Sequence, residues 1–441
     1  MTYSLAIDIG ASGGRHIVGW RCGGEIKTVE IYRFKNGMDT KDGHLVWDTE
    51  RLLSEVKTGI RESLRAYPDI KTVSIDTWGV DYVLLRENEE VYPVYAYRDS
   101  RVDEAIERVH EIISYPELYN RTGIQFNTFN TVYQLYADKL AGRLEGVTDF
   151  LMIPEYLMYK LTGVKKKEYT NASTMGLLNA MTKDFDVEIF ERLGLPKELI
   201  APLSQPGTLV GRFTDEVAAE VGGNMDVVFC ATHDTGSAVE AIDMKTNSPY
   251  ISSGTWSLFG VKLDSALTDD NSRNSGYSNE GGVGYIRYLK NITGMWIVQS
   301  LRSELCPDTD YGDIADMAAG SDFTETFDVN EKSFMAPESM AGAIDSYLSS
   351  RGLPTPKSVA DYFNSAYHSL AKSYREAVLA LENNLGVKYS EIYIVGGGAK
   401  NGYLNSLAER YTEKKIVALP IEATAIGNLK VQLDYCEKNL K

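Results

Sequence analysis

The sequence is poor in the side chains that build metal centres and disulfide frameworks. Its 441 residues include only four cysteines and five histidines. No two cysteines have CxxC spacing, so nothing indicates a zinc site or a thioredoxin-type motif. Cys230 follows the apolar run VVF and is expected to be a small core residue. The other cysteines are Cys22, Cys306 and Cys436.

Long apolar runs are also missing. No run approaches the roughly 20 residues that a membrane-spanning helix needs. The first residues, MTYSLAIDIG, lack the basic region and apolar stretch of a signal peptide. We therefore expect a cytoplasmic protein with reduced thiols and no membrane partner.

Positive charge is scarce as well. The chain has 45 Lys and Arg against 62 Asp and Glu, a net charge of −17. Partners such as nucleic acids or anionic membranes require basic patches, which this balance disfavours. The one lysine run, Lys165 to Lys167, predicts a solvated turn. A nucleotide can still bind where backbone N–H groups, a few cations and a metal offset its phosphates.

The chain contains enough hydrophobic residues for large cores, and its predicted elements follow a regular order. Hydrophobic residues make up 43 % and aromatic residues 10 %, and the length predicts two or three domains. The first part predicts a strand, a glycine loop, a hairpin turning at Gly23-Gly24, a helix and a strand. These elements are expected at 3–10, 15–34, 49–67 and 70–85.

A similar order restarts after residue 249 and indicates a duplication. Strand, small-residue loop and strand are expected over 250–263, and a long helix over 358–386 ends at a glycine. A strand, a triple-glycine loop and a helix follow over 391–411, and further elements over 414–420 and 422–433. We place the domain boundary near residues 243–249.

The first candidate site is DIGASGGR, Asp8 to Arg15. Its glycines would let backbone N–H groups approach an anion. Arg15 could supply fixed charge to a phosphate, and Asp8 could hold Mg²⁺ through water. A glycine-rich turn with a surface arginine explains the stretch about equally well. It matches neither GxxxxGK[ST] nor GxGxxG, which counts against the P-loop and Rossmann interpretations.

Two small-residue loops follow strands in the second half. In SSGTWS the Thr255 hydroxyl could meet phosphate oxygens, although an ordinary turn explains this stretch better on its own. IVGGGAKN, residues 394–401, sets three glycines between a strand and a helix, at a cost in backbone entropy. The approach of a ligand to a helix N-terminus would explain that cost better than a strained turn.

The stretch ATHDTGSAVEAI, residues 231–242, places His233 and Asp234 between an apolar strand and a helix. Asp234 suits the N-cap of that helix, and it could also accept a hydroxyl proton as a general base. For an isolated His-Asp pair, the cap and a buried, hydrogen-bonded histidine are favoured.

Two other stretches carry polar candidates. SIDTWGVDY contains Trp78, which could stack on a sugar ring, although core packing is the commoner fate of tryptophan. NITGMWIVQ offers Asn291 and Gln299 as ligands or as helix caps.

Each stretch alone is a weak signal, but together they resemble the FGGY family of carbohydrate kinases, which has the actin-like ATPase fold. The motifs cover nearly the whole chain in the family's order: DIGASGGR, IDTWGVD, YRDSR, THDTGSAV, SSGTWSL, NITGMWIVQ, VGGGAKN and EATAIGN. The resemblance implies an α/β protein of two actin-like ATPase (ribonuclease H-like) domains with a ligand cleft between them. We predict residues 1–245 as the domain with the sugar site, first phosphate loop and catalytic aspartate, and residues 246–441 as the nucleotide domain.

The resemblance further implies transfer of the γ-phosphate of ATP to the 1-hydroxyl of L-rhamnulose, with Mg²⁺ as the metal. It makes Asp234 the catalytic base, with a pKa that the nearby helix start is expected to lower. It makes Asp8 the residue that organises Mg²⁺. The ATP contacts it implies are Ala11, Ser12, Gly13, Gly14, Arg15, Thr255, Gln299, Gly397, Gly398 and Asn401. The sugar contacts it implies are Gly79, His233, Asp234, Thr235 and Asn291.

The sequence departs from the family in two places. Members often have serine at the position of Gly13, so one hydroxyl contact to phosphate is missing here. The chain also ends soon after EATAIGN, where members usually continue through further helix. We expect this to trim the C-terminal edge of the nucleotide domain.

Three other functions stay open. A kinase for another ketose or a polyol, such as L-fuculose or L-xylulose, would have related motifs. An actin-like ATPase that moves a protein partner is disfavoured by the motif at Asp234, and a sugar sensor without catalysis by intact Asp8 and Asp234. The oligomeric state is left open.

Overall fold

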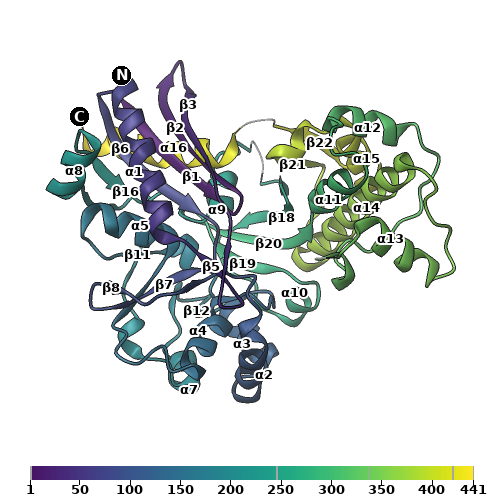
Figure 1. The fold of residues 1–441 in the computed structure, drawn as a ribbon. Coiled ribbons are helices and arrows are strands. Elements are labelled where there is room, and N and C mark those ends of the chain that lie inside the picture. The colour runs from purple at the N-terminus through teal and green to yellow at the C-terminus, as the bar shows by residue number, and fades with distance from the viewer. Residues whose placement is uncertain (1, 245–246, 336, 420–421, 441) are drawn as a thin grey trace. The chain divides into compact units, whose positions relative to one another are not determined.

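The chain forms two compact units in the computed structural model, which describes residues 2–244, 247–335, 337–419 and 422–440 (Figure 1). The first unit consists of Met1–Ala241, Leu263–Arg287 and Ala423–Lys441, and the second of Ile242–Lys262 and Tyr288–Glu422. The division into residues 1–245 and 246–441 stays a prediction about function. In space, two later segments group with the N-terminal part.

A six-stranded sheet with the strand order β15-β16-β6-β1-β2-β3 frames the first unit. β1 pairs in parallel with β6 and antiparallel with β2. β2 and β3 form the predicted hairpin, with Gly23 and Gly24 at positive φ. The strands are β1 (Tyr3–Gly10), β2 (Gly13–Cys22), β3 (Glu25–Lys35), β6 (Ile70–Thr77), β15 (Leu209–Arg212) and β16 (Asp226–Val228).

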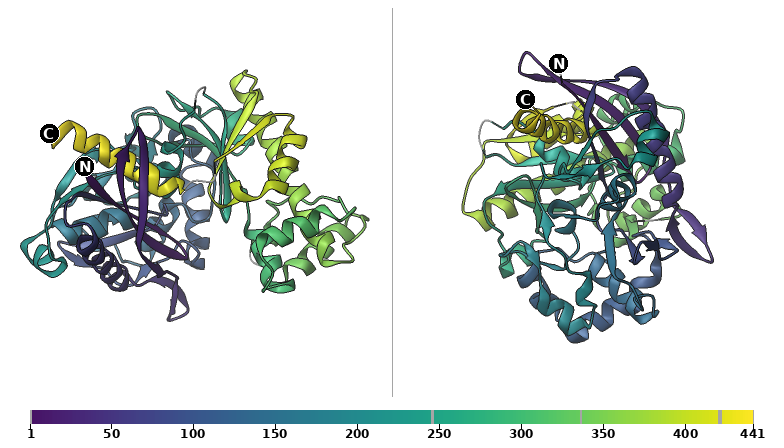
Figure 2. Two further views of the ribbon diagram at one scale, coloured as in Figure 1. Left: turned by 90° about the horizontal axis from the view of Figure 1, so that it is seen from above. Right: turned by 90° about the vertical axis from the view of Figure 1, so that its left-hand side faces the viewer.

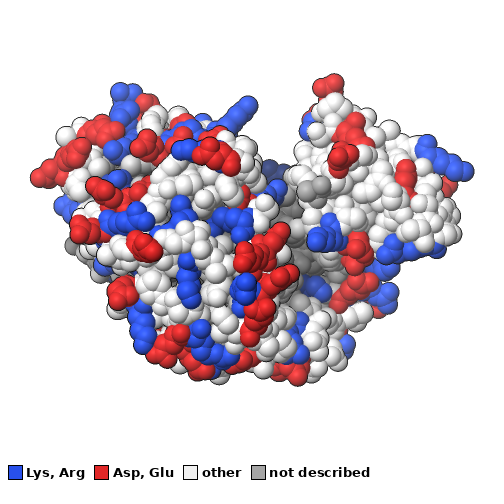
Figure 3. All heavy atoms as spheres, turned by 60° about the horizontal axis from the view of Figure 1, so that its bottom comes forward, with Lys and Arg blue, Asp and Glu red and all other residues white. Residues whose placement is uncertain are grey.

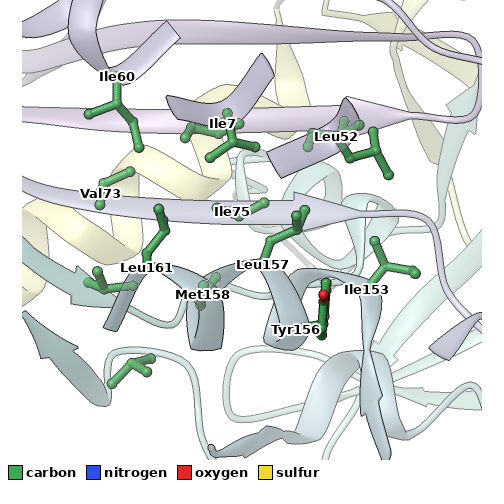
Figure 4. Close-up of a cluster of buried hydrophobic side chains, with 14 of the residues drawn as sticks. Ile7, Leu52, Ile60, Val73, Ile75, Ile153, Tyr156, Leu157, Met158 and Leu161 are labelled. Carbon is green, nitrogen blue, oxygen red and sulfur yellow. The ribbon is translucent and has the colours of Figure 1, made fainter. Parts of the chain in front are cut away.

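The two faces of this sheet have different coverings. Ile7 of β1 and Ile75 of β6 pack in a buried cluster with side chains of α1 and α5 (Figure 4). Because side chains alternate along a strand, Ala6 points to the opposite face, where it packs against α16. Asp8 lies on the same face as Ala6. The helices are α1 (Thr49–Ala66), α5 (Ile153–Thr162) and α16 (Ala423–Asn439).

The helix predicted over residues 49–67 is confirmed as α1, and local sequence signals explain its start and its buried face. The Asp48 side chain caps the helix by accepting the Arg51 N–H. Leu52, Val56 and Ile60 recur at helical spacing and are fully buried.

The C-terminal helix α16 packs within the first unit, against α9 (Asp234–Glu240) and β1. Figure 2, left, shows it in yellow alongside the purple N-terminal strands. A Cβ on Gly427 would lie 1.8 Å from the Ser237 carbonyl oxygen, so glycine permits this close approach of the two helices. The segment that begins with EATAIGN therefore supports α9 rather than the edge of the second unit.

A second buried core lies under the other helices of the first unit. The segment 263–287 is tied to it by the Tyr119 hydroxyl, which donates to the Tyr277 carbonyl (2.6 Å), and by the Gly281 N–H, which donates to Ser173 Oγ (2.7 Å). The remaining strands are β4 (Asp39–Lys41), β5 (His44–Trp47), β7 (Tyr82–Arg86), β8 (Glu89–Glu90), β9 (Val94–Tyr95), β10 (Asp149–Met152), β11 (Lys167–Glu168), β12 (Leu178–Asn179), β13 (Asp184–Phe185), β14 (Leu203–Ser204) and β19 (Ser278–Gly281). The remaining α-helices are α2 (Asp103–Ile112), α3 (Tyr115–Thr122), α4 (Thr131–Leu140), α6 (Tyr169–Ala172), α7 (Val187–Leu193), α8 (Asp215–Val221) and α10 (Asp270–Asn274), with short 3₁₀ turns at Ser100–Val102 and Lys197–Leu199.

The predicted solvated turn at 165–167 is wrong for its last residue. The Lys167 side chain is 1 % exposed, and its ammonium group pairs with Asp149 Oδ1 at 2.7 Å. It also donates to the Phe150 carbonyl and lies 4.1 Å from the centroid of the Phe150 ring. A buried charge needs such partners. They come from β10, which no local pattern around the lysine run indicates.

The second unit has strands in the order β20-β18-β17-β21-β22. The predicted long helix is confirmed as α14, which starts with a capping box of Ser358 and Asp361 and ends at Gly386. The strands are β17 (Tyr250–Ser253), β18 (Trp256–Leu263), β20 (Ile286–Thr293), β21 (Glu391–Val395) and β22 (Lys415–Ala418). The helices are α11 (Trp296–Leu305), α12 (Tyr311–Ala319), α13 (Met340–Ser349), α14 (Val359–Leu385) and α15 (Gly402–Thr412), with 3₁₀ turns at Lys332–Phe334 and Gly397–Lys400.

The surface shown in Figure 3 mixes acidic and basic side chains over the described residues, without one extended basic area. In the part of the chain that the structure describes, no helix combines the length and apolar character needed to cross a membrane.

Candidate active site

Two aspartates lie side by side near the carboxyl ends of β1 and β6. Asp8 and Asp76 are register partners in this parallel pair, so their side chains point to the same face of the sheet. They are 8 % and 0 % exposed. Burial, and then the charge of Asp8, raise the pKa of Asp76 well above its ordinary value. Asn428 of α16 donates to Asp76 Oδ2 at 2.5 Å.

Arg15 faces Asp8 across the antiparallel pair of β1 and β2. Its Nη2 donates to Asp8 Oδ2 at 2.6 Å, and its side chain is 22 % exposed. The residues of DIGASGGR that the sequence predicts for metal and phosphate are therefore ion-paired with each other. This contact sets the direction of both side chains.

The turn after β1 is shaped by Phe34 of β3. A Cβ on Gly14 would lie 2.2 Å from the Phe34 ring, so packing requires glycine there. A Cβ on Gly13 would lie 3.1 Å from the Phe34 carbonyl oxygen, which is tight but not prohibitive. Ala11 is partly buried and Ser12 is exposed. Among the residues from 11 to 14, Ser12 is thus the most accessible to a ligand.

Asp234 is the first residue of α9, and the N-cap is His233. The prediction that Asp234 caps the helix is therefore wrong. Its Oδ1 instead accepts the N–H of Thr235 at 2.6 Å. The chain just before the helix is held at the end of β6, where the Thr77 N–H donates to the Thr232 carbonyl at 2.9 Å.

Burial raises the pKa of Asp234 to about 6. His233 and the N–H of Thr235 lower this pKa, whereas the charge of Asp8 raises it. The predicted net lowering of this pKa is wrong. The Thr235 N–H at the helix start does lower it, but removal of the carboxylate from water outweighs that contribution. A carboxyl group that titrates near pH 6 can act as a general base at neutral pH.

A buried arginine contacts the residues on either side of Asp234. Arg287 is 0 % exposed and donates from Nη1 to Thr235 Oγ1 (2.8 Å) and from Nη2 to His233 Nδ1 (3.0 Å). Glu280 Oε2 lies 3.1 Å from Arg287 Nη2 and 3.3 Å from His233 Nδ1. Burial acts to raise the pKa of Glu280, but Arg287 and His233 leave that pKa lowered overall.

A buried glutamate holds the chain just before His233. The carboxylate of Glu168 is 0 % exposed and accepts the hydroxyl groups of Thr170 and Thr232, both at 2.6 Å. It also accepts the N–H groups of Thr170 (2.8 Å) and Thr232 (3.3 Å). Burial raises the pKa of Glu168, and these bonds limit the rise.

The sequence prediction missed Arg287, Glu280 and Glu168. Glu168 gave one local signal, since it caps the short helix α6 through the N–H groups of Thr170 and Asn171. Nothing near Arg287 or Glu280 indicates contact with His233, because only the tertiary fold brings these segments together.

Gly79 lies in a tight turn between β6 and β7. A Cβ there would come within 3.0 Å of Thr174 Oγ1. The next residue, Val80, adopts a φ of 67°, which is strained for a β-branched side chain. The Val80 N–H donates to Thr174 Oγ1 (3.1 Å), and the Thr131 hydroxyl donates to the Val80 carbonyl (2.7 Å). Strain held by the surroundings in this way is common at functional turns.

Trp78, next to this turn, belongs to the core. It is 7 % exposed, and its ring centroid lies 4.2 Å from that of Trp47. Both indole N–H groups donate to Asp81 Oδ2, at 2.9 Å and 2.6 Å. Burial raises the pKa of Asp81 to about 6. Of the two fates the sequence left open for Trp78, core packing is confirmed.

In the second unit, the loop of SSGTWS packs on the start of α11. The Thr255 carbonyl accepts the N–H groups of Gly294 and Trp296, both at 3.1 Å. The Thr255 hydroxyl donates to Gln299 Oε1 at 3.4 Å. A Cβ on Gly294 would lie 2.6 Å from the Ser257 nitrogen, so close packing requires that glycine. Two predicted ATP contacts therefore adjoin each other.

The three consecutive glycines serve different needs. Gly396 has a φ of +85°, and a Cβ on Gly398 would lie 2.0 Å from Ser253 Oγ. Conformation and packing against β17 thus explain these two. Gly397 is exposed, and a Cβ there would meet nothing within 4 Å. Only at Gly397 does the fold leave the absence of a side chain unexplained.

The two predicted asparagines differ in their surroundings. Asn401 caps α15, because its Oδ1 accepts the Leu404 N–H (2.9 Å) and its Nδ2 donates to the Tyr367 hydroxyl (3.0 Å). Asn291 is partly buried in the second-unit part of β20. The other predicted sugar contacts, Gly79 and residues 233–235, belong to the first unit.

Two family models match almost the whole chain. The N-terminal domain model of the FGGY family of carbohydrate kinases matches residues 3–239, and the C-terminal domain model matches residues 249–433. The chain belongs to the FGGY family of carbohydrate kinases, as its motifs predict.

Three curated proteins are similar to this chain over nearly its whole length. A protein of Halalkalibacterium halodurans named rhamnulokinase is 41 % identical, covering 98 % of this chain and 93 % of that protein. One of Oceanobacillus iheyensis with the same name is 40 % identical, covering 98 % and 92 %. A third, of Bacillus subtilis, is 38 % identical, covering 97 % and 89 %.

Solved structures confirm the two-domain α/β fold. A xylulose kinase of Lactobacillus acidophilus superposes with a TM-score of 0.81 at 16 % identity, covering 100 % of this chain and 91 % of that one. A gluconate kinase of the same organism gives 0.80 at 15 % identity, covering 100 % and 90 %. At such identities the likeness concerns the fold alone.

Proposed function

We propose that this chain transfers the γ-phosphate of ATP to the 1-hydroxyl of L-rhamnulose, giving L-rhamnulose 1-phosphate and ADP. The observation that carries the proposal is the identity of 40–41 % with two proteins named rhamnulokinase over 98 % of this chain. Membership in a family of carbohydrate kinases makes ATP and a sugar the substrates. A cytoplasmic location stays a prediction.

Asp234 acts as the general base in this proposal. Its pKa of about 6 lets it be ionised at neutral pH and still accept a proton. The Thr235 N–H holds one carboxylate oxygen at 2.6 Å and so fixes the direction of the group. A moderate base suffices, because the transition state of phosphoryl transfer is loose and the attacking hydroxyl becomes acidic late.

His233 and Thr235 bind sugar hydroxyl groups beside this base, and Gly79 lets the sugar approach the backbone of its turn. The support for these roles is that each residue is held by buried partners: Arg287 for the first two, and Thr174 for the turn. A preorganised site does not have to order these groups when the substrate binds.

Arg15 supplies positive charge to the phosphates, and the backbone of Ala11 to Gly14 supplies N–H donors. The residues around Asp8 also suit Mg²⁺. This ion prefers oxygen ligands and is usually held by one or two carboxylates with waters and phosphate oxygens. Asp8 offers such a carboxylate, and its register partner Asp76 has a buried Oδ1 with no hydrogen-bond partner. When bound, the ion would offset the negative charge of the phosphates.

The described part of the chain offers no complete set of protein ligands for such an ion. Among the described residues, no group of three or more His, Cys, Asp or Glu side chains is arranged to hold a metal. Binding of Mg²⁺ together with the nucleotide agrees with this.

The second unit binds the nucleotide in this proposal. Thr255 and Gln299 adjoin each other. Because a Cβ on Gly397 would meet no other atom, a flat ligand such as a nucleotide base can approach the backbone there. Gly398 and Asn401 support this surface through their packing and capping contacts. The role of Asn291 as a sugar contact stays a prediction from the family resemblance.

A panel of ketoses tests the proposal. Coupled assays with L-rhamnulose, L-fuculose and L-xylulose give kcat/KM for each, and ³¹P–¹H correlation identifies the phosphorylated carbon. We expect L-rhamnulose to exceed the others by roughly tenfold or more, the size of effect that one or two well-placed hydroxyl contacts give. A higher value for another ketose would replace the substrate. ATP turnover without any sugar would instead favour an actin-like ATPase.

A further inference from the structure

The buried pair Arg287 and Glu280 has no role of its own among the proposed contacts to sugar, nucleotide or metal. We propose that Arg287, backed by Glu280, is a positioning residue that fixes the tautomer of His233 and the hydroxyl direction of Thr235, and through them the affinity for the sugar. The inference rests on the proposed function only for the identity of the ligand.

The contacts of the guanidinium group fix it in place. Its Nε donates to the Gly281 carbonyl at 2.7 Å, Nη1 to Thr235 Oγ1 at 2.8 Å, and Nη2 to His233 Nδ1 at 3.0 Å. Glu280 Oε2 lies 3.1 Å from Nη2 and balances the buried charge. Because an unpaired buried charge is strongly destabilising, this arrangement leaves the arginine little freedom.

The direction of each hydrogen bond follows from chemistry. A guanidinium group can only donate, so His233 Nδ1 accepts from it at 3.0 Å. Glu280 Oε2 is also near Nδ1, at 3.3 Å, but it lies closer to Arg287 Nη2, at 3.1 Å, and we assign it to the guanidinium group. A neutral imidazole that accepts at Nδ1 carries its proton on Nε2. His233 Nε2 lies 3.5 Å from Asp234 Oδ1, so the ring N–H is on the side of the proposed base. Thr235 Oγ1 likewise accepts from Arg287. It also lies 3.2 Å from both ring nitrogens of His233, so Arg287 and the ring together set the direction of its hydroxyl proton.

Two donors are therefore preset beside Asp234, the Nε2–H of His233 and the hydroxyl of Thr235. An oxygen of a sugar is a suitable acceptor for both. A site built to pair with a substrate oxygen discriminates against molecules that lack it. The pair Arg287 and Glu280 should therefore affect sugar binding and selectivity more than proton removal.

The tautomer can be measured without any substrate. The chain has five histidines, so full-length protein labelled with ¹⁵N-histidine gives few ring signals, and His233→Gln assigns the relevant one. At pH 8, long-range ¹H–¹⁵N correlation should give His233 as the Nε2–H form in the wild type and as a mixture in Arg287→Lys. An Nδ1–H form in the wild type, or an unchanged pattern in the variant, would overturn the inference.

Kinetics supply the second readout. For Arg287→Lys we expect KM for L-rhamnulose to rise about tenfold, which corresponds to ~1.4 kcal/mol. We expect kcat to fall by less than about threefold and KM for ATP to stay unchanged, because only sugar binding is affected. Unchanged sugar affinity would contradict the inference.

Arg143→Lys is the matched control. Arg143 also pairs with a buried carboxylate, Asp138 (2.8 Å), and donates to a backbone carbonyl, that of Pro93 (2.7 Å). Lysine at this position should change stability but not KM for the sugar. An equal rise of KM in both variants would mean that Arg287 is merely structural.

The remaining outcomes are also separable. If Arg287→Lys does not fold, the double variant Glu280→Gln/Arg287→Met removes both charges at once and avoids an unpaired one. It should again lose the single His233 tautomer. If the wild type does not phosphorylate L-rhamnulose, the proposed function fails, whereas the tautomer measurement still decides the inference.

Discussion

The candidate sugar site of the first unit and the candidate nucleotide site of the second are built by different means. Around Asp234, buried charged side chains hold every neighbour: Glu168 holds Thr232, and Arg287 holds His233 and Thr235. Around Gly397, backbone contacts and close glycine packing dominate. We therefore expect substitutions that change polarity to have their largest effects in the first site. Substitutions that change side-chain volume should have their largest effects in the second.

The sharpest test of this contrast on the polar side is Asp234→Asn. Asparagine keeps the shape but cannot accept the hydroxyl proton, so we expect kcat to fall by roughly 10²–10⁴-fold, the range of general-base catalysis. Calorimetric titration should give nearly unchanged affinities for ATP and L-rhamnulose. Turnover close to that of the wild type would remove Asp234 from the role of base.

On the packing side, the neighbouring glycines form a matched pair. Gly398→Ala sets a Cβ 2.0 Å from Ser253 Oγ, and we expect it to lower the free energy of unfolding by about 1–3 kcal/mol, as overpacking does. Gly397→Ala meets nothing within 4 Å, so its stability should be unchanged and KM for ATP should rise. Denaturant unfolding and steady-state kinetics separate the two effects. Equal changes of stability and of KM for ATP in the two variants would contradict this assignment of roles to Gly397 and Gly398.

The partly buried carboxylate of Asp234 should also lower the stability of the fold at neutral pH. The pKa of Asp234 is raised from 3.8 to about 6 in the fold, so its favourable contribution is full below pH 3.8 and is lost as the pH rises through 6. The full difference corresponds to roughly 3 kcal/mol. Because 28 % of the side chain is exposed, we expect Asp234→Asn to stabilise by about 1–2 kcal/mol at pH 7.5.

This gain should shrink toward pH 4.5, where the wild-type carboxyl group is protonated as well. Thermal unfolding of both proteins across this range measures it. A variant less stable than the wild type at pH 7.5 would mean that the ionised carboxylate is well compensated, contrary to our view of the first site.

The smallest expected effect concerns the first glycine loop. A Cβ on Gly13 would lie 3.1 Å from the Phe34 carbonyl, so Gly13→Ser requires a shift of a few tenths of an ångström. We expect stability to change by less than about 1 kcal/mol and KM for ATP by less than about threefold. A large loss of stability or a large rise in KM for ATP would mean that this loop tolerates no added side-chain volume, as is expected for the loop at Gly398.

The sequence alone predicted the element order and the family, because strands, glycine loops and the long helix carry local signals. It could not predict the environment of Asp234. The cap at His233 and the raised pKa depend on burial and on Asp8, which only the folded sheet brings close. Arg287 could not be predicted for the same reason, since its partners Thr235 and His233 lie 52 and 54 residues earlier in the chain. Glu168 has a local signal as the cap of α6, but its contact with Thr232, 64 residues later, has none. The predicted roles of individual site residues stay predictions.

The central claim is that Asp234 is a base whose pKa is raised by partial burial. Its most direct test is the pH dependence of kcat/KM for L-rhamnulose, which reports the free enzyme. We expect kcat/KM to rise tenfold per pH unit below an inflection near pH 6, the pKa of Asp234, and to level off above it. In Asp234→Asn the residual activity should lack this inflection. A wild-type profile that stays flat down to pH 5, or an inflection that persists in Asp234→Asn, would contradict the claim.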